Sequence, residues 1–304
     1  MRKTLFSGIA ACLFATAATA AEQSPSVIWT VGQADRSASE FALAPDRFRD
    51  FLANDFGYED KYFLVGHSVP AADFPYVLPG PADTWGGTWP TSGWRTHQVN
   101  ILFGLKEIPS DGTCTLVVDL LDYAKNFLPL VKVSVNTQDA KFQLDAPGLS
   151  VADQRKPNQM EKIVDTLSIT GNLAKATPRR LEIPIRPGVL KAGGNEVTIT
   201  VLEGSWILFD RVSLEGPAGT NVEQPQQLFI RNIEAAPYEL ADGKRRVQPL
   251  LVDLEWLEGA PALSVELDGK EILNQRIETG RYQLEAPMPQ VKKAKKSAYR
   301  ILCD

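Results

Sequence analysis

Apolar and polar residues alternate with a period of two through most of this chain, and long amphipathic helical patterns are scarce. Such alternation is typical of half-buried strands, because successive side chains of a strand point to opposite sides. The predicted strands lie around residues 27–31, 98–105, 115–121, 131–135, 142–144, 181–185, 197–201 and 206–214. Short helices are expected at residues 45–52 and 160–167. Many short strands between Gly and Pro turns predict an all-β, jelly-roll β-sandwich.

A second set of strands follows a break in this pattern. The break, residues 216–221 followed by 223–227, is rich in Gly, Pro and Gln, as linkers are. Beyond it, apolar residues alternate at 250–256 and 263–267, and Asp268-Gly269 predicts a tight hairpin turn. We therefore expect a signal segment at 1–20, a first β-sandwich at 21–216, a linker at 217–227 and a second β-rich module at 228–304.

The second module faintly repeats the first. Leu116-Val-Val-Asp-Leu120 parallels Leu250-Leu-Val-Asp-Leu254, the alternating residues 131–135 parallel 263–267, and residues 142–147 parallel 282–287. Three matches in the same order indicate two related sandwiches. The chain stops at Asp304 inside a predicted strand, so we expect the second sandwich to be incomplete and to come from a truncated or interrupted large protein.

The first twenty residues have the features of a secretory signal. Arg2 and Lys3 precede an apolar run over residues 5–17, and Ala18-Thr-Ala20 provides small residues for cleavage. The run is too short to span a membrane, and no second apolar stretch follows it. The mature chain is therefore predicted to be secreted or periplasmic. Lipidation at Cys12 is the weaker alternative, because the apolar run continues past that residue.

The charge of the chain restricts its possible partners, and its cysteines restrict its possible disulfides. Cleavage after Ala20 leaves 284 residues, and the formal charge of −5 becomes −7 without Arg2 and Lys3. A mildly acidic chain lacks the basic surface with which proteins bind nucleic acid, so no nucleic-acid partner is expected. Cys114 and Cys303 belong to different predicted modules; their pairing stays open, and we favour buried free thiols.

The sequence lacks the usual patterns of catalytic and metal sites. The chain has two histidines, His67 and His97, and no histidine or cysteine pair with the spacing of metal ligands. Residues 66–70 lack the second glycine and the helix of a nucleophile elbow. Asp119 stands out in an apolar strand, and an edge or hydrogen-bonded position explains it. We expect no catalytic residue, no metal site and no cofactor, while a structural calcium ion stays open.

One segment rich in proline and glycine concentrates aromatic residues. Three of the six tryptophans lie between residues 85 and 94, shortly after Tyr76. The prolines and glycines exclude a regular helix or a central strand. Flat indole faces suit a sugar ring, whereas the alternative is a loop whose indoles cap the core. His97, beside a predicted strand, is either structural or a further contact. The candidate carbohydrate-binding residues are Tyr76, Trp85, Trp89, Trp94, Arg95 and His97.

Several motifs resemble a known family. Residues 27–35, followed by Ser39-Glu40-Phe41, resemble the W-x-I-G-x-x-D…E-F opening of the carbohydrate-binding third domain of polysaccharide lyase family 4, the rhamnogalacturonan lyases. The likeness continues through Phe74-Pro-Tyr76 and Trp85. It ends with L-x-x-G-x-N at residues 190–195 and W-x-x-x-D-x-x-x-L at 206–214, a pattern shared by many galactose-binding-like jelly rolls. It covers residues 26–216.

This resemblance implies a β-sandwich appended to carbohydrate-active enzymes, but it does not carry over lyase activity. In the lyases, catalysis belongs to a separate β-domain that precedes this one. Residues 226–304 also resemble, more weakly, segments ahead of the catalytic domain in secreted α-mannosidase-like glycoside hydrolases. We expect a secreted, non-catalytic module for pectic or related plant or algal polysaccharide, accessory to a catalytic glycoside-degrading domain or protein. A polysaccharide lyase or glycoside hydrolase, and a purely structural sandwich, stay open as alternatives.

Overall fold

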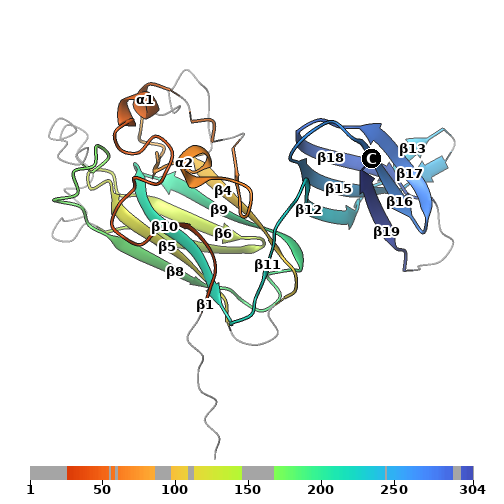
Figure 1. Ribbon diagram of the computed structural model, residues 1–304, viewed down its shortest axis with the longest axis horizontal. Coiled ribbons are helices and arrows are strands. Elements are labelled where there is room, and N and C mark those ends of the chain that lie inside the picture. Colours follow the sequence, from red (N-terminus) through yellow and green to blue (C-terminus); the bar gives the residue numbers. More distant parts are fainter. Residues whose placement is uncertain are drawn as a thin grey trace, which may run out of the picture.

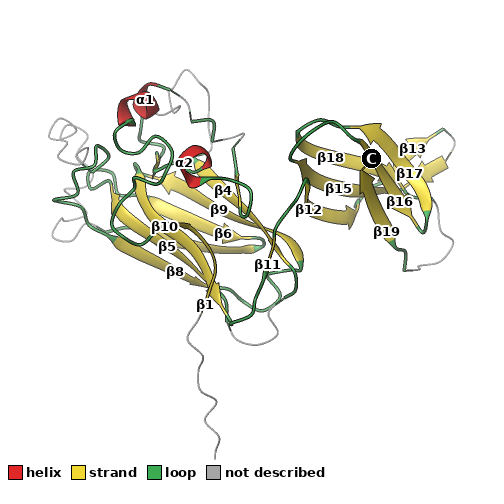
Figure 2. Ribbon diagram, viewed as in Figure 1, coloured by secondary structure: helices red, strands yellow, loops and turns green. Residues whose placement is uncertain are grey.

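The structure is a computed structural model that describes residues 26–54, 56–58, 61–85, 97–108, 113–145, 168–243, 245–289 and 296–303. Strands dominate it, which confirms the all-β sandwich expected from the alternation (Figures 1 and 2). Its two helices are α1 (Phe48–Ala53) and α2 (Pro70–Asp73). Across the described ranges, no helix has the length and apolar character required to cross a membrane. The predicted helix at 160–167, the signal segment and Cys12 lie outside the described residues.

The first module, which we define as residues 26–223, packs two sheets face to face. One sheet has the order β1-β10-β5-β8 with β3 beside β10, and the other has the order β11-β4-β9-β6-β7 with β2 beside β4. The strands of the first sheet are β1 (Ser26–Gly32), β3 (Val77–Leu78), β5 (Thr115–Tyr123), β8 (Arg179–Pro184) and β10 (Ile207–Gly216). Those of the other sheet are β2 (Phe63–Leu64), β4 (Gln98–Leu105), β6 (Leu130–Val135), β7 (Gln138–Gln143), β9 (Gly193–Glu203) and β11 (Val222–Glu223).

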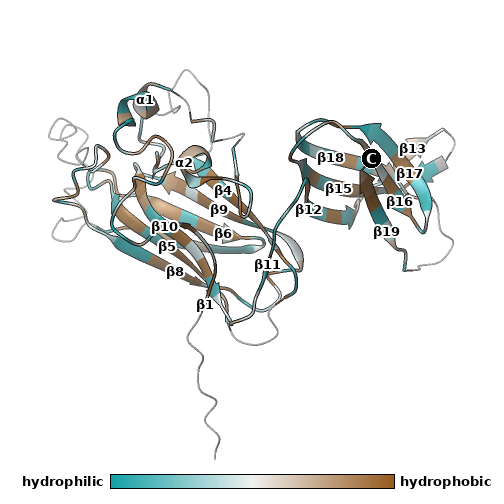
Figure 3. Ribbon diagram, viewed as in Figure 1, coloured by the Kyte–Doolittle hydropathy of each residue, from teal (hydrophilic) through white to brown (hydrophobic). Residues whose placement is uncertain are grey.

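The alternating pattern explains which faces of these strands are buried. In β6, Val131, Val133 and Val135 are fully buried, while the residues between them are half-buried. Burying one such side chain contributes roughly 1.5–3 kcal/mol. By contrast, β5 is buried on both faces over most of its length, as its nearly continuous apolar run predicts. Figure 3 shows the more hydrophilic colours on edge strands such as β8 and β17 (Lys270–Arg276).

The L-x-x-G-x-N motif builds one corner of the first module. The buried Asn195 amide donates to the carbonyls of Lys191 at 2.8 Å and Gly193 at 2.9 Å. Its Oδ1 accepts from the N–H of Lys191 at 3.0 Å and from Nδ2 of Asn136 at 2.8 Å. Gly193 has a φ of +80°, which side chains disfavour. The motif therefore fixes the turn before β9 and ties it to the β6–β7 hairpin.

The second module, residues 228–303, packs the sheet β12-β15-β18 against the sheet β17-β16-β19, with a separate ribbon of β13 and β14. Its core is a cluster of its own, which includes Val252, Leu254 and Val265. The predicted turn at Asp268-Gly269 joins β16 to β17, and both residues have positive φ. The remaining strands are β12 (Leu228–Ala235), β13 (Leu240–Asp242), β14 (Arg245–Val247), β15 (Pro249–Trp256), β16 (Ala262–Leu267), β18 (Gly280–Pro287) and β19 (Tyr299–Cys303).

The pairings of the second module repeat part of the first. β15 pairs with β18 as β5 does with β8, β16 and β17 form a hairpin like β6 and β7, and β19 lies beside β16 as β9 lies beside β6. Two of the three sequence matches fall on corresponding strands. The third is wrong: Phe142 lies in β7, whereas Tyr282 lies in β18, which corresponds to β8. The short shared pattern of the third match is common to unrelated strands.

The linker and strand β12 join the two modules. Phe229 of β12 is buried in one cluster with Leu64 and Leu102 of the first module. Arg231 donates to Glu196 of β9 at 2.9 Å and to the buried Glu255 of β15 at 2.6 Å. No disulfide spans the modules: Cys114 is buried in the first and Cys303 is half-buried in the second.

One close contact between the modules depends on a glycine. A Cβ at Gly194 would lie 2.1 Å from the carbonyl oxygen of Ile230, a distance that real Cβ atoms do not reach. The neighbouring Gly193 has no atom within 4 Å of such a Cβ. The two glycines therefore serve different purposes: Gly193 permits a turn, and Gly194 permits contact between backbones.

Candidate functional site

An aromatic cluster joins α1 to the described residues 76–85. Its centre is Phe51 of α1, whose ring centroid lies 5.4 Å from that of Tyr76 and 5.8 Å from that of Trp85, both edge to face. Tyr58 also meets Phe51 edge to face at 6.4 Å, and its hydroxyl donates to the carbonyl of Val77 at 3.0 Å. A short helix without a side-chain cap is weak on its own, so this packing holds α1 in place.

Trp85 lies at the boundary between this cluster and the solvent. Its side chain packs against the core of the first module, yet the residue is only half-buried. An indole held edge-on by Phe51 keeps part of its surface open at little further cost in side-chain entropy. Part of Trp85 is therefore exposed at this end of the module.

Asp83 fixes the backbone two residues before Trp85. Its carboxylate accepts hydrogen bonds from the N–H of Gly80 at 2.7 Å and from the hydroxyl of Ser205 at 2.5 Å. Burial raises the pKa of Asp83 to about 6, although both hydrogen bonds oppose the shift. The segment that carries Trp85 is thus anchored to the turn before β10 through a carboxyl group that titrates near pH 6.

Of the other predicted binding residues, Tyr76 lies in the core of the first module. Tyr76 is fully buried, and burial raises the pKa of its hydroxyl. A sugar contact would require this ring to leave the core, so we remove Tyr76 from the candidate set. Strand β3 begins at the next residue and directs the ring inward, which the proline-rich sequence did not reveal.

His97 is half-buried at the start of β4, where its carbonyl accepts from the N–H of Val201 at 3.0 Å. Trp89, Trp94 and Arg95 lie outside the described residues.

A small hollow lies near the start of β4. It has a volume of about 10 Å³ and is lined by side chains that include Tyr62, Gln98 and Asn100. That space holds about one water molecule, not a sugar ring. This hollow cannot hold a sugar ring, so the candidate feature at this end of the module is the aromatic edge formed by Phe51, Tyr58 and Trp85.

The conspicuous carboxylates of the first sheet have structural partners. Asp119 accepts from Arg211 at 2.9 Å and from Arg180 at 3.3 Å, which confirms the expected hydrogen-bonded position. Asp210 accepts from the N–H of Arg36 at 3.0 Å, and burial raises its pKa to about 6. Among the residues that the structure describes, no group of three or more His, Cys, Asp or Glu side chains could hold a metal ion.

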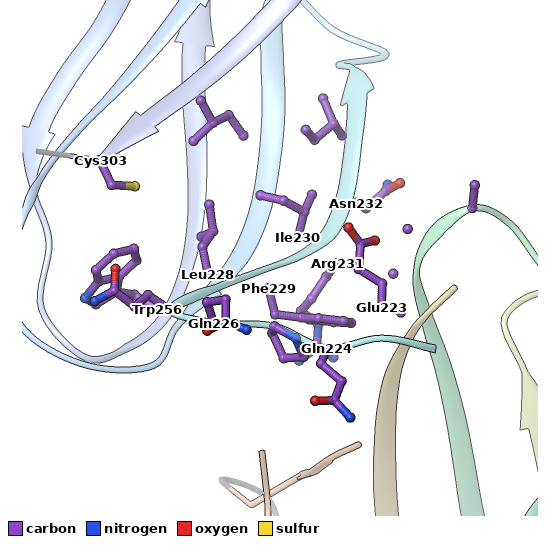
Figure 4. Close-up of a pocket in the computed structure, with 18 of the residues that line it drawn as sticks. Glu223, Gln224, Gln226, Leu228, Phe229, Ile230, Arg231, Asn232, Trp256 and Cys303 are labelled. Carbon is purple, nitrogen blue, oxygen red and sulfur yellow. The ribbon is translucent and has the colours of Figure 1, made fainter. Parts of the chain in front are cut away.

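A groove of about 810 Å³ lies between the two modules, and sequence reasoning missed it. It is bounded by residues 224–233, by residues 191–194 of the first module and by residues near the end of β19. Figure 4 shows Leu228 and Ile230 on the side of β12 toward Cys303, and Arg231 on the side toward the first module. Trp256 at the base is buried and donates to the carbonyl of Gly259 at 3.1 Å, so its indole presents no open platform.

The groove could not have been found from local sequence. Residues 224–227 are polar and were expected to form a linker, and no predicted strand or site included Leu228 or Ile230. Both become groove walls only because β19, about seventy residues later in the chain, ends opposite them.

Two sheets packed face to face, with helices and an aromatic edge at one end, define the first module as a jelly-roll β-sandwich (Figure 1). Residues 27–214 match the family described as "CBM-like: Polysaccharide lyase family 4, domain III", and the chain belongs to that family. The match confirms the resemblance that the sequence motifs indicated, with almost the same bounds.

Comparisons with other proteins add little to this assignment. No curated protein matches the chain. Among solved structures, it is similar to a family GH115 4-O-methyl-α-glucuronidase with specificity for decorated arabinogalactans, at 12% identity and a TM-score of 0.29, over 70% of this chain and 19% of that one. It is also similar to a GH2 β-galacturonidase from Eisenbergiella tayi, at 9% identity and a TM-score of 0.20, over 71% of this chain and 36% of that one.

A β-glucuronidase from an uncultured Clostridium sp. is similar at 10% identity and a TM-score of 0.22, over 67% of this chain and 32% of that one. The chain therefore spans between 19% and 36% of the length of these three proteins. With TM-scores this low, the similarities carry no argument about its site or activity.

Proposed function

We propose that this chain is a secreted or periplasmic carbohydrate-binding module, not catalytic itself, that serves a carbohydrate-active enzyme. The observation that carries the proposal is the family match over residues 27–214, which includes almost all of the first module. Because the family description names a polysaccharide lyase, pectic or related plant or algal polysaccharide is the ligand class we favour. Its catalytic partner would be a glycoside-degrading domain or protein.

In this proposal the ligand stacks on the segment from Trp85 to His97. The half-buried Trp85, supported by Phe51 and anchored through Asp83, supplies the first indole face. Trp89 and Trp94 are the further stacking residues that we propose, and Arg95 and His97 are the proposed polar contacts. Each stack or net hydrogen bond contributes around 1 kcal/mol, so a few of them give micromolar to millimolar dissociation constants. Weak binding suffices when a module only raises the local concentration of an attached catalyst.

The test is retention of the full chain on immobilised rhamnogalacturonan and polygalacturonan, with cellulose as a reference matrix. Trp89→Ala combined with Trp94→Ala leaves the Trp85–Phe51 contact intact, and we expect about thirtyfold weaker retention from the loss of two stacks, or roughly 2 kcal/mol. Adding Trp85→Ala should abolish retention. Tyr238→Ala is the matched control, because this aromatic residue is also exposed but lies in the second module; it should bind like the unmodified chain.

The outcomes separate this proposal from its rivals. Unchanged retention of a folded triple variant would remove the stacking mechanism. Turnover of pectin or of α-mannosides by the purified chain would favour an enzyme. Absence of binding to every polysaccharide on a glycan array would favour a purely structural sandwich.

A further inference from the structure

The two modules differ at one strand edge. In the first module, β4 pairs antiparallel with β9 along its whole length, from Gln98↔Thr200 to Leu105↔Gly193. β19 takes the corresponding place in the second module, because it lies beside β16 as β9 lies beside β6. Among the described strands, β19 pairs with β16 alone. The other edge of residues 299–302 therefore presents backbone groups to none of the described strands, a ready template for another chain.

The groove between the modules runs along this edge. Leu228 and Ile230 of β12 and Ile301 of β19 line it, and all three are half-buried side chains that pack against the core of the second module. Polar residues of the linker, Gln224 and Gln226, stand at its rim. An apolar floor beside an open strand edge suits a peptide backbone whose alternate side chains are apolar.

Residues of the first module cover the side of the groove that lies along β12. Lys191 of the first module donates to the carbonyl of Arg231 at 3.2 Å, and Gly194 meets the carbonyl of Ile230. The first module therefore borders the groove on the side of β12. A second copy of the chain would bring a whole sheet against this border, whereas a single strand needs only the free edge of β19 and the apolar floor.

We propose that this groove receives a single extended segment of another polypeptide, which pairs with β19 and completes that sheet. In the first module β4 takes the same place, with Val99, Ile101 and Phe103 buried on its inner face. The occupant is accordingly about as long as β19 and carries apolar side chains at alternate positions. Backbone pairing provides affinity, and the floor of Leu228, Ile230 and Ile301 selects the side chains.

The test uses the full chain and a fluorescent peptide with the sequence of residues 98–105, extended by a solubilising lysine tail. We expect saturable binding by fluorescence anisotropy. At saturation, hydrogen exchange of the amides at residues 299–302 should slow by about tenfold or more. Two control peptides carry N-methyl groups on alternate residues, one in each register. The peptide methylated on the pairing register should not bind, whereas the other should.

A pair of protein variants gives an independent readout. Ile301→Lys places a charge in the groove and should abolish peptide binding, while Leu302→Lys, on the opposite face of β19, should leave it unchanged. Equal binding of both methylated peptides, protection confined to another strand, or no binding at millimolar peptide would overturn the proposal. Self-association of the chain with protection of β19 would assign the groove to a second copy and overturn it as well. None of these outcomes depends on polysaccharide retention, so the proposed function is tested separately.

Discussion

In the first module the sheet that contains β9 continues to β4, whereas in the second module the corresponding strand β19 is an edge among the described strands. β1 extends the first sheet beyond β10, and β4 covers the edge of β9. The second module has corresponding strands for β5 to β9, but none of its described strands takes the place of β4. The described aromatic ring pairs also all lie in the first module, for example Phe74 with Phe209 at 5.1 Å. Corresponding strands such as β9 and β19 thus have a covered or an exposed edge, according to which strands lie beside them.

The largest expected effect tests whether the two cores are independent. Phe209→Ala removes a fully buried ring from the first module and should lower its free energy of unfolding by about 3–5 kcal/mol. Because the cores are separate clusters, exchange of the buried amides of β15 and β16 should change much less. Val265→Ala, in the second core, is the reciprocal control. Equal losses in both modules for both variants would show one cooperative unit and break the comparison.

Asn195 tests how the first module fixes the turn before β9. Asn195→Ala removes four hydrogen bonds of a buried amide, so we expect the first module to lose about 2–4 kcal/mol. Asn274→Ala on the exposed face of β17 removes one hydrogen bond to Glu271 and should cost less than about 0.5 kcal/mol. Urea denaturation compares the two. A loss for Asn195→Ala as small as that of the control would contradict the role assigned to the L-x-x-G-x-N motif.

Asp83 makes the first module sensitive to pH. Its folded pKa of about 6 lies above the unfolded value of 3.8, so its stabilising contribution is complete below pH 4 and is lost as the pH rises through 6. Asp83→Asn mimics the protonated form, because an amide can accept from Gly80 and donate to Ser205. At pH 7 this variant should be more stable than the unmodified chain by about 2–3 kcal/mol, with little difference at pH 4. Thermal unfolding across this range checks the sign, and a variant that is less stable at pH 7 would refute it.

Gly194 tests whether the backbone contact between the two modules sets their spacing. Gly194→Ala forces a Cβ against the carbonyl of Ile230, so the modules must move apart at a cost of about 1–2 kcal/mol. Gly193→Ala, its neighbour, should cost about 1 kcal/mol through backbone strain alone and leave the spacing unchanged. Small-angle scattering distinguishes them. An unchanged scattering profile for Gly194→Ala would show that this contact does not set the spacing.

The sequence predicted where the strands lie along the chain better than it predicted which residues lie next to one another in space. The bounds of β4 follow from its alternation, and the turn at Asp268-Gly269 from its residue types, because both signals are local. The alternation also predicted that Val131, Val133 and Val135 are buried, since one face of a strand must meet the core.

Features that depend on distant segments were not predictable in this way. Tyr76 looked accessible in a proline-rich stretch, but Phe51 and β3 place it in the core. Gly194 looked like part of a turn, whereas its absent side chain makes room for Ile230 of the other module. The groove likewise arises from β12 and β19, which are not adjacent in the chain, so no local pattern marks it.

Hydrogen–deuterium exchange of the full chain, measured with and without a saturating pectic oligosaccharide, tests most directly where the sugar binds. We predict slower exchange over residues 84–97, next to the half-buried Trp85, and unchanged exchange along β19. Slower exchange confined to the groove between the modules, or no change anywhere in the chain, would contradict the assignment of carbohydrate binding to the aromatic edge of the first module.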